Sequence, residues 1–184
     1  MNYNRIKTLA VIAAAAMAGL ALPLTQAQVV AVSNLANNSG NNKILVNTTL
    51  WASSFTTGGA AQTFQSLTVP LSRQTPSGDS VTAYLYNDNG PSGVPGTVIP
   101  NGILGPISVP AGATTESLYT FTPLSTVTFD ANETYWVVLA SPGIITEASI
   151  WSGTINLSET GPLGWSIGDR IFLNTGSGWC PCRP

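Results

Sequence analysis

After residue 27 the chain consists of short hydrophobic runs separated by Gly, Pro and Asn, a pattern typical of β-strands joined by turns. In residues 80–87 apolar side chains alternate with Thr and Tyr, which predicts a strand with one face in a core. Residues 133–140 are apolar on both alternating faces, so we expect a strand that is central or covered on both sides. Residues 44–55 predict one long strand. Residues 64–72 predict another, which Pro70 places at a sheet edge or at a bulge.

Five more short strands complete the predicted set of nine or ten, and no segment after residue 27 shows sustained helical periodicity. These strands are expected at 103–110, 117–122, 125–130, 148–153 and 168–174. A parallel sheet would require crossover helices, so the strands are expected to pair antiparallel. The sequence therefore predicts an all-β protein, an antiparallel two-sheet β-sandwich of jelly-roll-like type.

Both ends of the chain are expected to lie outside this domain. Residues 1–27 have a short basic start, an apolar run of about 15 residues and small residues before Gln28, the layout of a cleaved secretory signal peptide. The run is shorter than the roughly 20 residues of a membrane-spanning helix, so the mature chain is expected to carry no transmembrane anchor. We expect a flexible polar lead-in at 28–43, the β-sandwich domain at 44–175 and a disordered tail at 176–184.

Charge narrows the classes of partner. Only 8% of the residues are charged, and the mature chain keeps four basic and all eight acidic residues, a net charge of about −4. No basic cluster exists, which argues against nucleic acid as a partner. We expect an exported protein that faces solvent or polymer.

The absence of histidine excludes several kinds of site. Ser-His-Asp and Cys-His nucleophiles and His-ligated zinc are impossible, and we expect no cofactor. Cys180 and Cys182 are the only cysteines, too few for a zinc site or a disulfide framework. Two interpretations of these cysteines stay open: they lie in a disordered tail without a role, or they form a disulfide between two chains.

Carboxylates and amides offer two weak possibilities. A glycoside hydrolase needs two facing carboxylates across a cleft, and the eight acidic residues lie mostly at predicted strand ends and turns, where they usually cap or meet solvent. Asn87, Asp88 and Asn89 form an oxygen-rich turn before Gly90, a weak candidate for a cation site. An ordinary turn with positive φ at Asn89-Gly90 explains the same residues.

Aromatic residues offer a third possibility, because exposed rings on a β-sandwich can stack on sugars. Trp51, Trp136 and Trp151 lie in predicted strands and are assigned to the core. Trp165 lies between Gly164 and Ser166 in a turn-like context and is the candidate for an exposed ring, together with Tyr86.

Four segments in a fixed order resemble the choice-of-anchor R domain. These are "ASSFTTG", "VTAYLYNDNGPSGVPGTVI", "FTPLSTVTFDANETYWVVLAS" and "GWSIGDR", which together span residues 52–173. The resemblance implies an exported bacterial β-domain, found with various C-terminal surface anchors such as the PEP-CTERM tail, and no enzyme activity. It also leads us to expect an anchor after the domain. The printed chain carries no hydrophobic tail there, so we expect a freely secreted form or a chain altered at its 3′ end.

The sequence thus predicts a secreted or cell-surface, non-catalytic β-sandwich with a structural or adhesive role, whose partners are extracellular polysaccharide or cell-envelope components. A carbohydrate-binding module is the alternative, and a glycoside hydrolase the remote one.

Overall fold

The computed structural model describes residues 31–33, 35, 41–73, 77–144, 148–153, 159–174 and 178–181. Within these ranges the regular structure is almost entirely β-strand, with a single-turn 3-10 helix at Pro162–Gly164. No helix in the described part of the chain has the length and apolar character needed to cross a membrane. The strands are β1 (Asn41–Leu45), β2 (Thr49–Thr56), β3 (Gln62–Thr63), β4 (Leu67–Arg73), β5 (Asp79–Asn87), β6 (Val98–Val109), β7 (Ser117–Phe121), β8 (Thr128–Phe129), β9 (Thr134–Ala140), β10 (Ser149–Gly153), β11 (Ser166–Asn174) and β12 (Gly178–Pro181).

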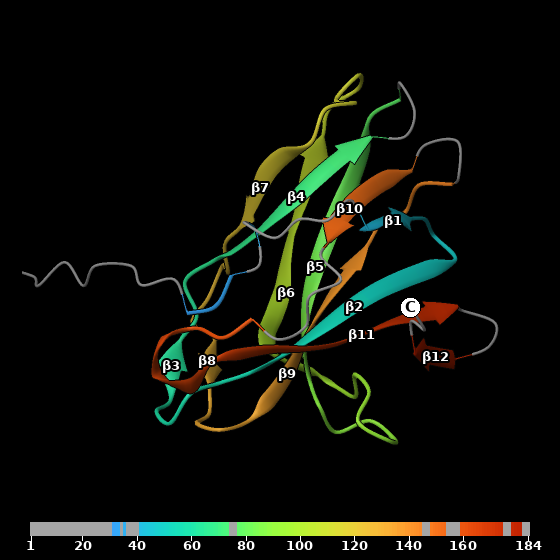
Figure 1. Cartoon of the computed structure of the whole chain (residues 1–184). Helices are drawn as coiled ribbons and strands as arrows, with labels where there is room; N and C mark the ends of the chain where they lie inside the picture. Colours follow the sequence, from blue (N-terminus) through green and yellow to red (C-terminus); the bar gives the residue numbers. More distant parts are fainter. Residues whose placement is uncertain are drawn as a thin grey trace, which may run out of the picture.

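Two antiparallel sheets face each other, which confirms the predicted β-sandwich (Figure 1). One sheet has four strands in the order β1-β10-β4-β7. The other has six in the order β12-β11-β2-β9-β5-β6, and β3 and β8 form a short separate ribbon.

The strand pairings are nested, which is the signature of a jelly roll. β5 pairs with β6, β4 with β7, β3 with β8, β2 with β9 and β1 with β10. The chain from β1 to β10 is therefore one long antiparallel ribbon that doubles back at the β5–β6 loop. Rolling up the ribbon brings β4 beside β10 and β5 beside β9, which closes the two sheets. The hairpin β11–β12 then extends the larger sheet beyond β2.

The main core lies between the sheets and follows the alternation predicted for β5. Val81, Ala83 and Leu85 are fully buried there, while Tyr84 and Tyr86 point to the outer face of the six-stranded sheet. β9 is the central strand predicted from its two apolar faces, because it lies between β2 and β5. Its odd-numbered residues join the main core, and Trp136 and Val138 join a second cluster on the outer face.

Two expectations for single strands were wrong. Residues 44–55 are not one strand, because the chain turns at Val46–Thr49, where the Thr49 N–H donates to the Val46 carbonyl at 3.1 Å, and continues in the other sheet. β4 is not an edge strand either, since it lies between β10 and β7. Pro70 is tolerated because the pairing with β10 covers only Leu71–Arg73, so Pro70 has a paired strand on one side alone.

The predicted domain ends need correction as well. Asn41–Lys43, expected in the flexible lead-in, already belong to β1. Gly178–Pro181, expected in a disordered tail, form β12, because the free edge of β11 offers a ladder and Trp179 packs on the outer-face cluster. The predicted signal peptide at 1–27 lies outside the described residues.

A buried ion pair joins the two sheets at the end of the sandwich where β5 begins. Arg73 Nη1 lies 3.1 Å from Asp79 Oδ2, and the two side chains are 0% and 3% exposed. The same carboxylate oxygen accepts hydrogen bonds from the hydroxyls of Ser141 (2.6 Å) and Ser149 (2.8 Å). The Ser80 N–H donates to Asp79 Oδ1 at 2.7 Å. This carboxylate is therefore a structural anchor of the sandwich.

Candidate functional site

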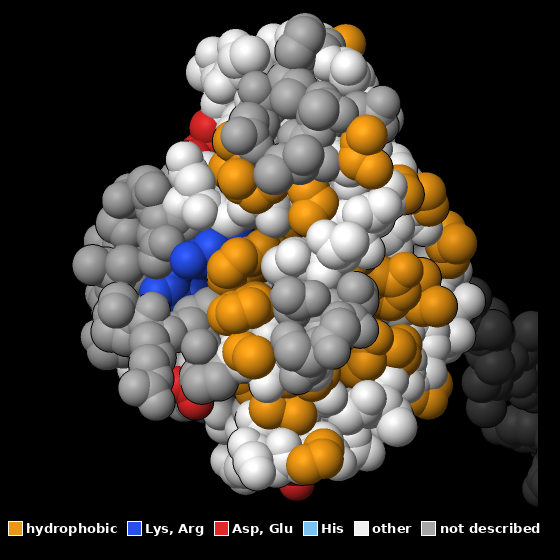
Figure 2. Space-filling model, turned by 90° about the vertical axis from the view of Figure 1, so that its right-hand side faces the viewer, with side chains coloured by type: hydrophobic (Ala, Val, Ile, Leu, Met, Phe, Trp, Pro, Cys, Tyr) orange, Lys and Arg blue, Asp and Glu red, His pale blue; other side chains and the backbone are white. Residues whose placement is uncertain are grey.

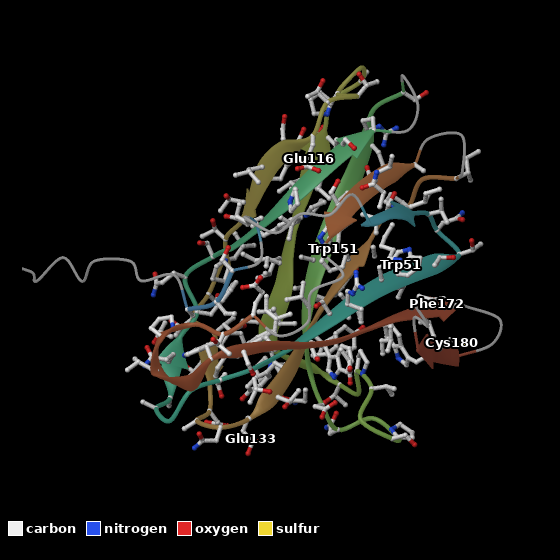
Figure 3. The ribbon with its side chains drawn as sticks, in the orientation of Figure 1. Trp51, Glu116, Glu133, Trp151, Phe172 and Cys180 are labelled. Atoms are coloured by element: carbon white, nitrogen blue, oxygen red, sulfur yellow. The ribbon has the colours of Figure 1, made fainter. Side chains whose placement is uncertain are left out.

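A polar pocket lies at the opposite end of β5, where the β5–β6 loop meets the β8–β9 loop. Its volume is about 340 Å³. Its lining is mostly polar and consists of Asn87, Asp88, Asn89, Asp130, Asn132, Glu133, Thr134 and Tyr135. Figure 3 places Glu133 at this end of the molecule and Glu116 at the other.

The β5–β6 loop is held in shape by the side chain of Asn89. Asn89 Oδ1 accepts the N–H of Thr97 at 2.9 Å, and its Nδ2 donates to the Thr97 hydroxyl at 3.2 Å. The backbone reverses at Ser92 and Gly93, both with positive φ, rather than at Asn89-Gly90 as expected. Gly96 packs so closely that an added Cβ would lie 2.6 Å from the Gly90 nitrogen.

Asp88 is fixed by the outer-face cluster. The Trp136 indole Nε1 donates to Asp88 Oδ1 at 2.7 Å, and Trp136 is 1% exposed. A charge-assisted hydrogen bond to a buried indole holds the carboxylate in one orientation at the pocket. Asp88 therefore links the pocket to the centre of the six-stranded sheet.

The β8–β9 loop is fixed from below by Thr57 and Tyr135. The buried Thr57 hydroxyl donates to the Asp130 carbonyl at 2.6 Å and accepts the Glu133 N–H at 2.9 Å. The Tyr135 hydroxyl accepts the N–H of Asp130 at 2.9 Å. Asn132 adopts positive φ (57°), a conformation that Asn tolerates better than most residues. Both walls of the pocket are thus set by hydrogen bonds to the strands.

The phenol of Tyr135 is kept in its neutral form. Burial raises its pKa above the ordinary value of 10.0, the hydrogen bond from the Asp130 backbone lowers it, and the nearby Asp130 and Glu133 charges raise it. Burial is the largest of these effects.

The pocket suits a ligand that both donates and accepts hydrogen bonds. Its three carboxylates only accept, whereas its three amides do both. No Lys or Arg is among the lining residues, so the local field is negative. Asn87, Asp88 and Asn89, the weak candidates for a cation site, do lie together here. Within the described parts of the chain, however, no group of three or more His, Cys, Asp or Glu residues could hold a metal ion.

Next to the pocket, the outer face of the six-stranded sheet carries aromatic side chains. Tyr84, Tyr86 and Trp179 are half-buried and pack around Trp136 and Val138. The ring centroids of Tyr84 and Tyr86 are 6.4 Å apart, with 56° between the ring planes. Burial, and to a lesser extent the neighbouring Tyr84, raises the pKa of Tyr86 above 10.0. Tyr86, predicted as a presented ring, is thus partly accessible at the surface.

The expectation for Trp165 was wrong. It is 6% exposed and stacks on Phe55, with 5.9 Å between ring centroids and 9° between the planes. The turn-like residues around it misled the prediction, because Pro162–Gly164 turn the indole into the main core. Trp51, Trp136 and Trp151 pack in or against the clusters as predicted.

A second group of aromatic residues lies at one side of the sandwich. On this side β11 and β12 extend the six-stranded sheet beyond β1, the edge strand of the four-stranded sheet. Trp51 and Phe172 lie near each other here (Figure 3), with 5.3 Å between their ring centroids. Lys43 Nζ lies 4.6 Å from the Trp51 ring centroid. Hydrophobic side chains gather on this side of the molecule, with Lys and Arg side chains beside them (Figure 2). The Trp51 indole N–H donates to the Ile44 carbonyl at 2.8 Å, so this ring secures β1. Cys180 is half-buried near Phe172, and Cys182 lies outside the described residues.

Sequence reasoning found one wall of the pocket and missed the other. Asp130, Asn132 and Glu133 follow Asn87–Asn89 by some forty residues, and only the pairing of β5 with β9 brings them together. The available signal was the position of both segments beside predicted strands, residues 87–89 at the end of one and residues 130–133 at the start of the other.

Comparisons with known proteins gave no match to a family model, to a curated protein or to a solved structure.

Proposed function

We propose that this chain is an exported, non-catalytic binding domain that holds the hydroxyl groups of a glycan in its polar pocket. The observation that carries the proposal is the pocket itself, with acceptors and donors fixed by hydrogen bonds on a rigid β-sandwich. Preorganised polar groups lose little freedom when a ligand binds. Most small-molecule pockets are lined by apolar groups, so a mostly polar lining favours a polyhydroxylated ligand.

An extracellular setting agrees with the sequence. The signal-like residues 1–27 and the low charge content support export, and the resemblance to the choice-of-anchor R domain supports a place in the extracellular matrix or at a bacterial surface. The partner would then be extracellular polysaccharide or a cell-envelope glycan, and the role adhesive.

A glycoside hydrolase is the second candidate, because Asp88, Asp130 and Glu133 line one pocket. Two carboxylates that face each other across a bound sugar are the minimum for that reaction. Binding ranks first because it needs only the hydrogen-bonding groups that line the pocket, whereas hydrolysis also needs two carboxylates at a set separation.

The test is a glycan array probed with the mature protein, followed by titration of the best glycan. Glu133→Gln and Asn132→Ala should each weaken binding, since both lose contacts in the pocket. Glu116→Gln at the opposite end removes the same charge and should leave binding unchanged. Absence of binding to any glycan, or equal loss in the Glu116 control, would refute the proposal. Release of new reducing ends that Glu133→Gln abolishes would establish the hydrolase instead.

A further inference from the structure

We propose that the ligand is an extended, uncharged polysaccharide that enters the pocket with one sugar unit and continues across the outer face over Tyr86 and Tyr84. This inference rests on the proposed function. It adds the class of the ligand and the path that the ligand takes from the pocket across the outer face.

The pocket and the outer face are continuous along β5. Tyr86, Asn87 and Asp88 follow one another in the chain; Tyr86 points to the outer face, while the next two residues line the pocket. Tyr86 pairs with Trp136 across the strands, and Trp136 is the residue that holds Asp88. A ligand group bound beside Asp88 therefore lies next to the Tyr86 ring.

The two tyrosines offer separate contacts. A pyranose has one largely apolar face, which stacks on an aromatic ring, and its hydroxyl edge can bond to a phenol. Because the rings are 6.4 Å apart and tilted by 56°, they do not form one flat platform, and each contacts a different sugar unit. On the neighbouring strand β6, Val98 and Ile103 pair with Tyr86 and Tyr84 and are 36% and 56% exposed, so they widen the apolar track.

Charge selects a neutral polymer. The outward positions of β2, β5 and β9, strands described in full, carry no Asp, Glu, Lys or Arg. The pocket adds three carboxylates without a basic residue, and the mature chain has a net charge of about −4. An anionic polysaccharide would be repelled by the carboxylates of the pocket and would meet no basic side chain on the outward positions of β2, β5 and β9, whereas uncharged hydroxyls can hydrogen-bond to the carboxylates and amides of the pocket.

The test uses neutral oligosaccharides, from mono- to hexasaccharides of the glucan, mannan and galactan types, with alginate and heparin as anionic probes. The wild-type mature protein should bind a neutral hexasaccharide at least about tenfold more tightly than its monosaccharide. Tyr84→Ala, which removes the ring that lies further from the pocket than Tyr86, should reduce this dependence on length but leave monosaccharide binding intact. Tyr119→Ala is the matched control, because Tyr119 is a half-buried tyrosine of the other sheet. Circular dichroism checks the fold of each variant.

The outcomes separate the two proposals. Monosaccharide binding that depends on Glu133, without a gain in affinity with length, or a preference for alginate or heparin would overturn this inference and leave the pocket as the site. Loss of monosaccharide binding in the folded Tyr84→Ala variant would also overturn it. Failure of every probe would overturn both.

Discussion

Replacement of Asp79 by Asn should strongly destabilise the protein, because Asp79 is the acceptor on which the sheet-joining network converges. Its Oδ2 accepts from Arg73, Ser141 and Ser149, and its Oδ1 accepts from a backbone N–H. In Asp79→Asn one oxygen becomes an NH₂ group that faces other donors. The change also removes the Asp79 charge that lies 3.1 Å from the Arg73 guanidinium, which is 0% exposed.

The expected loss follows from these contacts. Removing one partner of a buried ion pair costs about 3–5 kcal/mol, since the other charge remains buried. Loss of two or more hydrogen bonds to a charged acceptor, at about 1.5–3 kcal/mol each, gives a cost of the same size. The ion-pair cost and the hydrogen-bond cost describe the same loss of stability, so the two values are not added together. We therefore expect the free energy of unfolding to fall by about 4 kcal/mol, a large share of the roughly 5–15 kcal/mol of a typical domain.

Urea unfolding of the mature protein, followed by tryptophan fluorescence, measures this change from the midpoint and slope. Asp169→Asn is the control, because Asp169 is an exposed aspartate at the surface of β11, and its loss should stay within about 0.5 kcal/mol. In Arg73→Met with Asp79→Asn no charge is left buried, so the double variant should lose clearly less than the sum of the two single variants. A loss below about 1 kcal/mol for Asp79→Asn, or strict additivity in the cycle, would show that this network does not stabilise the fold as argued.

Three further predictions concern the pocket and its surroundings. Trp136→Phe removes the donor that holds Asp88 and should lower the free energy of unfolding by about 2 kcal/mol, measured by urea unfolding, with weaker glycan binding in the same variant. Gly96→Ala should abolish glycan binding, measured by titration, because its Cβ would collide with the Asn89 side chain that closes the loop; normal affinity would contradict the described geometry. Alkaline pH should destabilise the protein, because the pKa of the Tyr86 phenol is raised in the folded state. As the pH rises, the unfolded chain loses the phenol proton before the folded protein does, which favours unfolding. The melting temperature should therefore fall once the pH exceeds about 10. Tyr86→Phe should reduce that slope, and an identical pH profile would refute the assignment.

The alternation of side chains predicted the parts of the fold that depend on local pattern. Residues 80–87 and 133–140 each become the strand that their two faces predict, because burial acts on every second residue. Residues 44–55 look equally continuous, yet the chain changes sheets at Asn47. Strand propensity is similar on both sides of the turn, and the single turn-favouring residue Asn47 was too weak a signal to predict the break.

The errors at the ends and at Trp165 have a different cause, namely partners that are distant in sequence. β12 exists because β11 presents a free edge, and Trp165 is buried because Phe55, more than a hundred residues earlier, lies beside it. Contacts between residues that are distant in sequence also explain why only half of the pocket could be predicted. Asp88 could be singled out from its turn, whereas Glu133 becomes its neighbour only when β5 pairs with β9.

The nested pairing of the strands also sets an order in which the chain can fold. Tyr86 and Val98 pair across a short loop, whereas Leu45 and Ser149 pair across about a hundred residues, a separation that makes direct encounter slow. Each pair formed from the β5–β6 hairpin outward brings the next two strands together, so one long loop closure is replaced by several short ones. We therefore expect assembly of the roll to begin at the loop that builds one wall of the pocket, and to end with the pairing of β1 and β10.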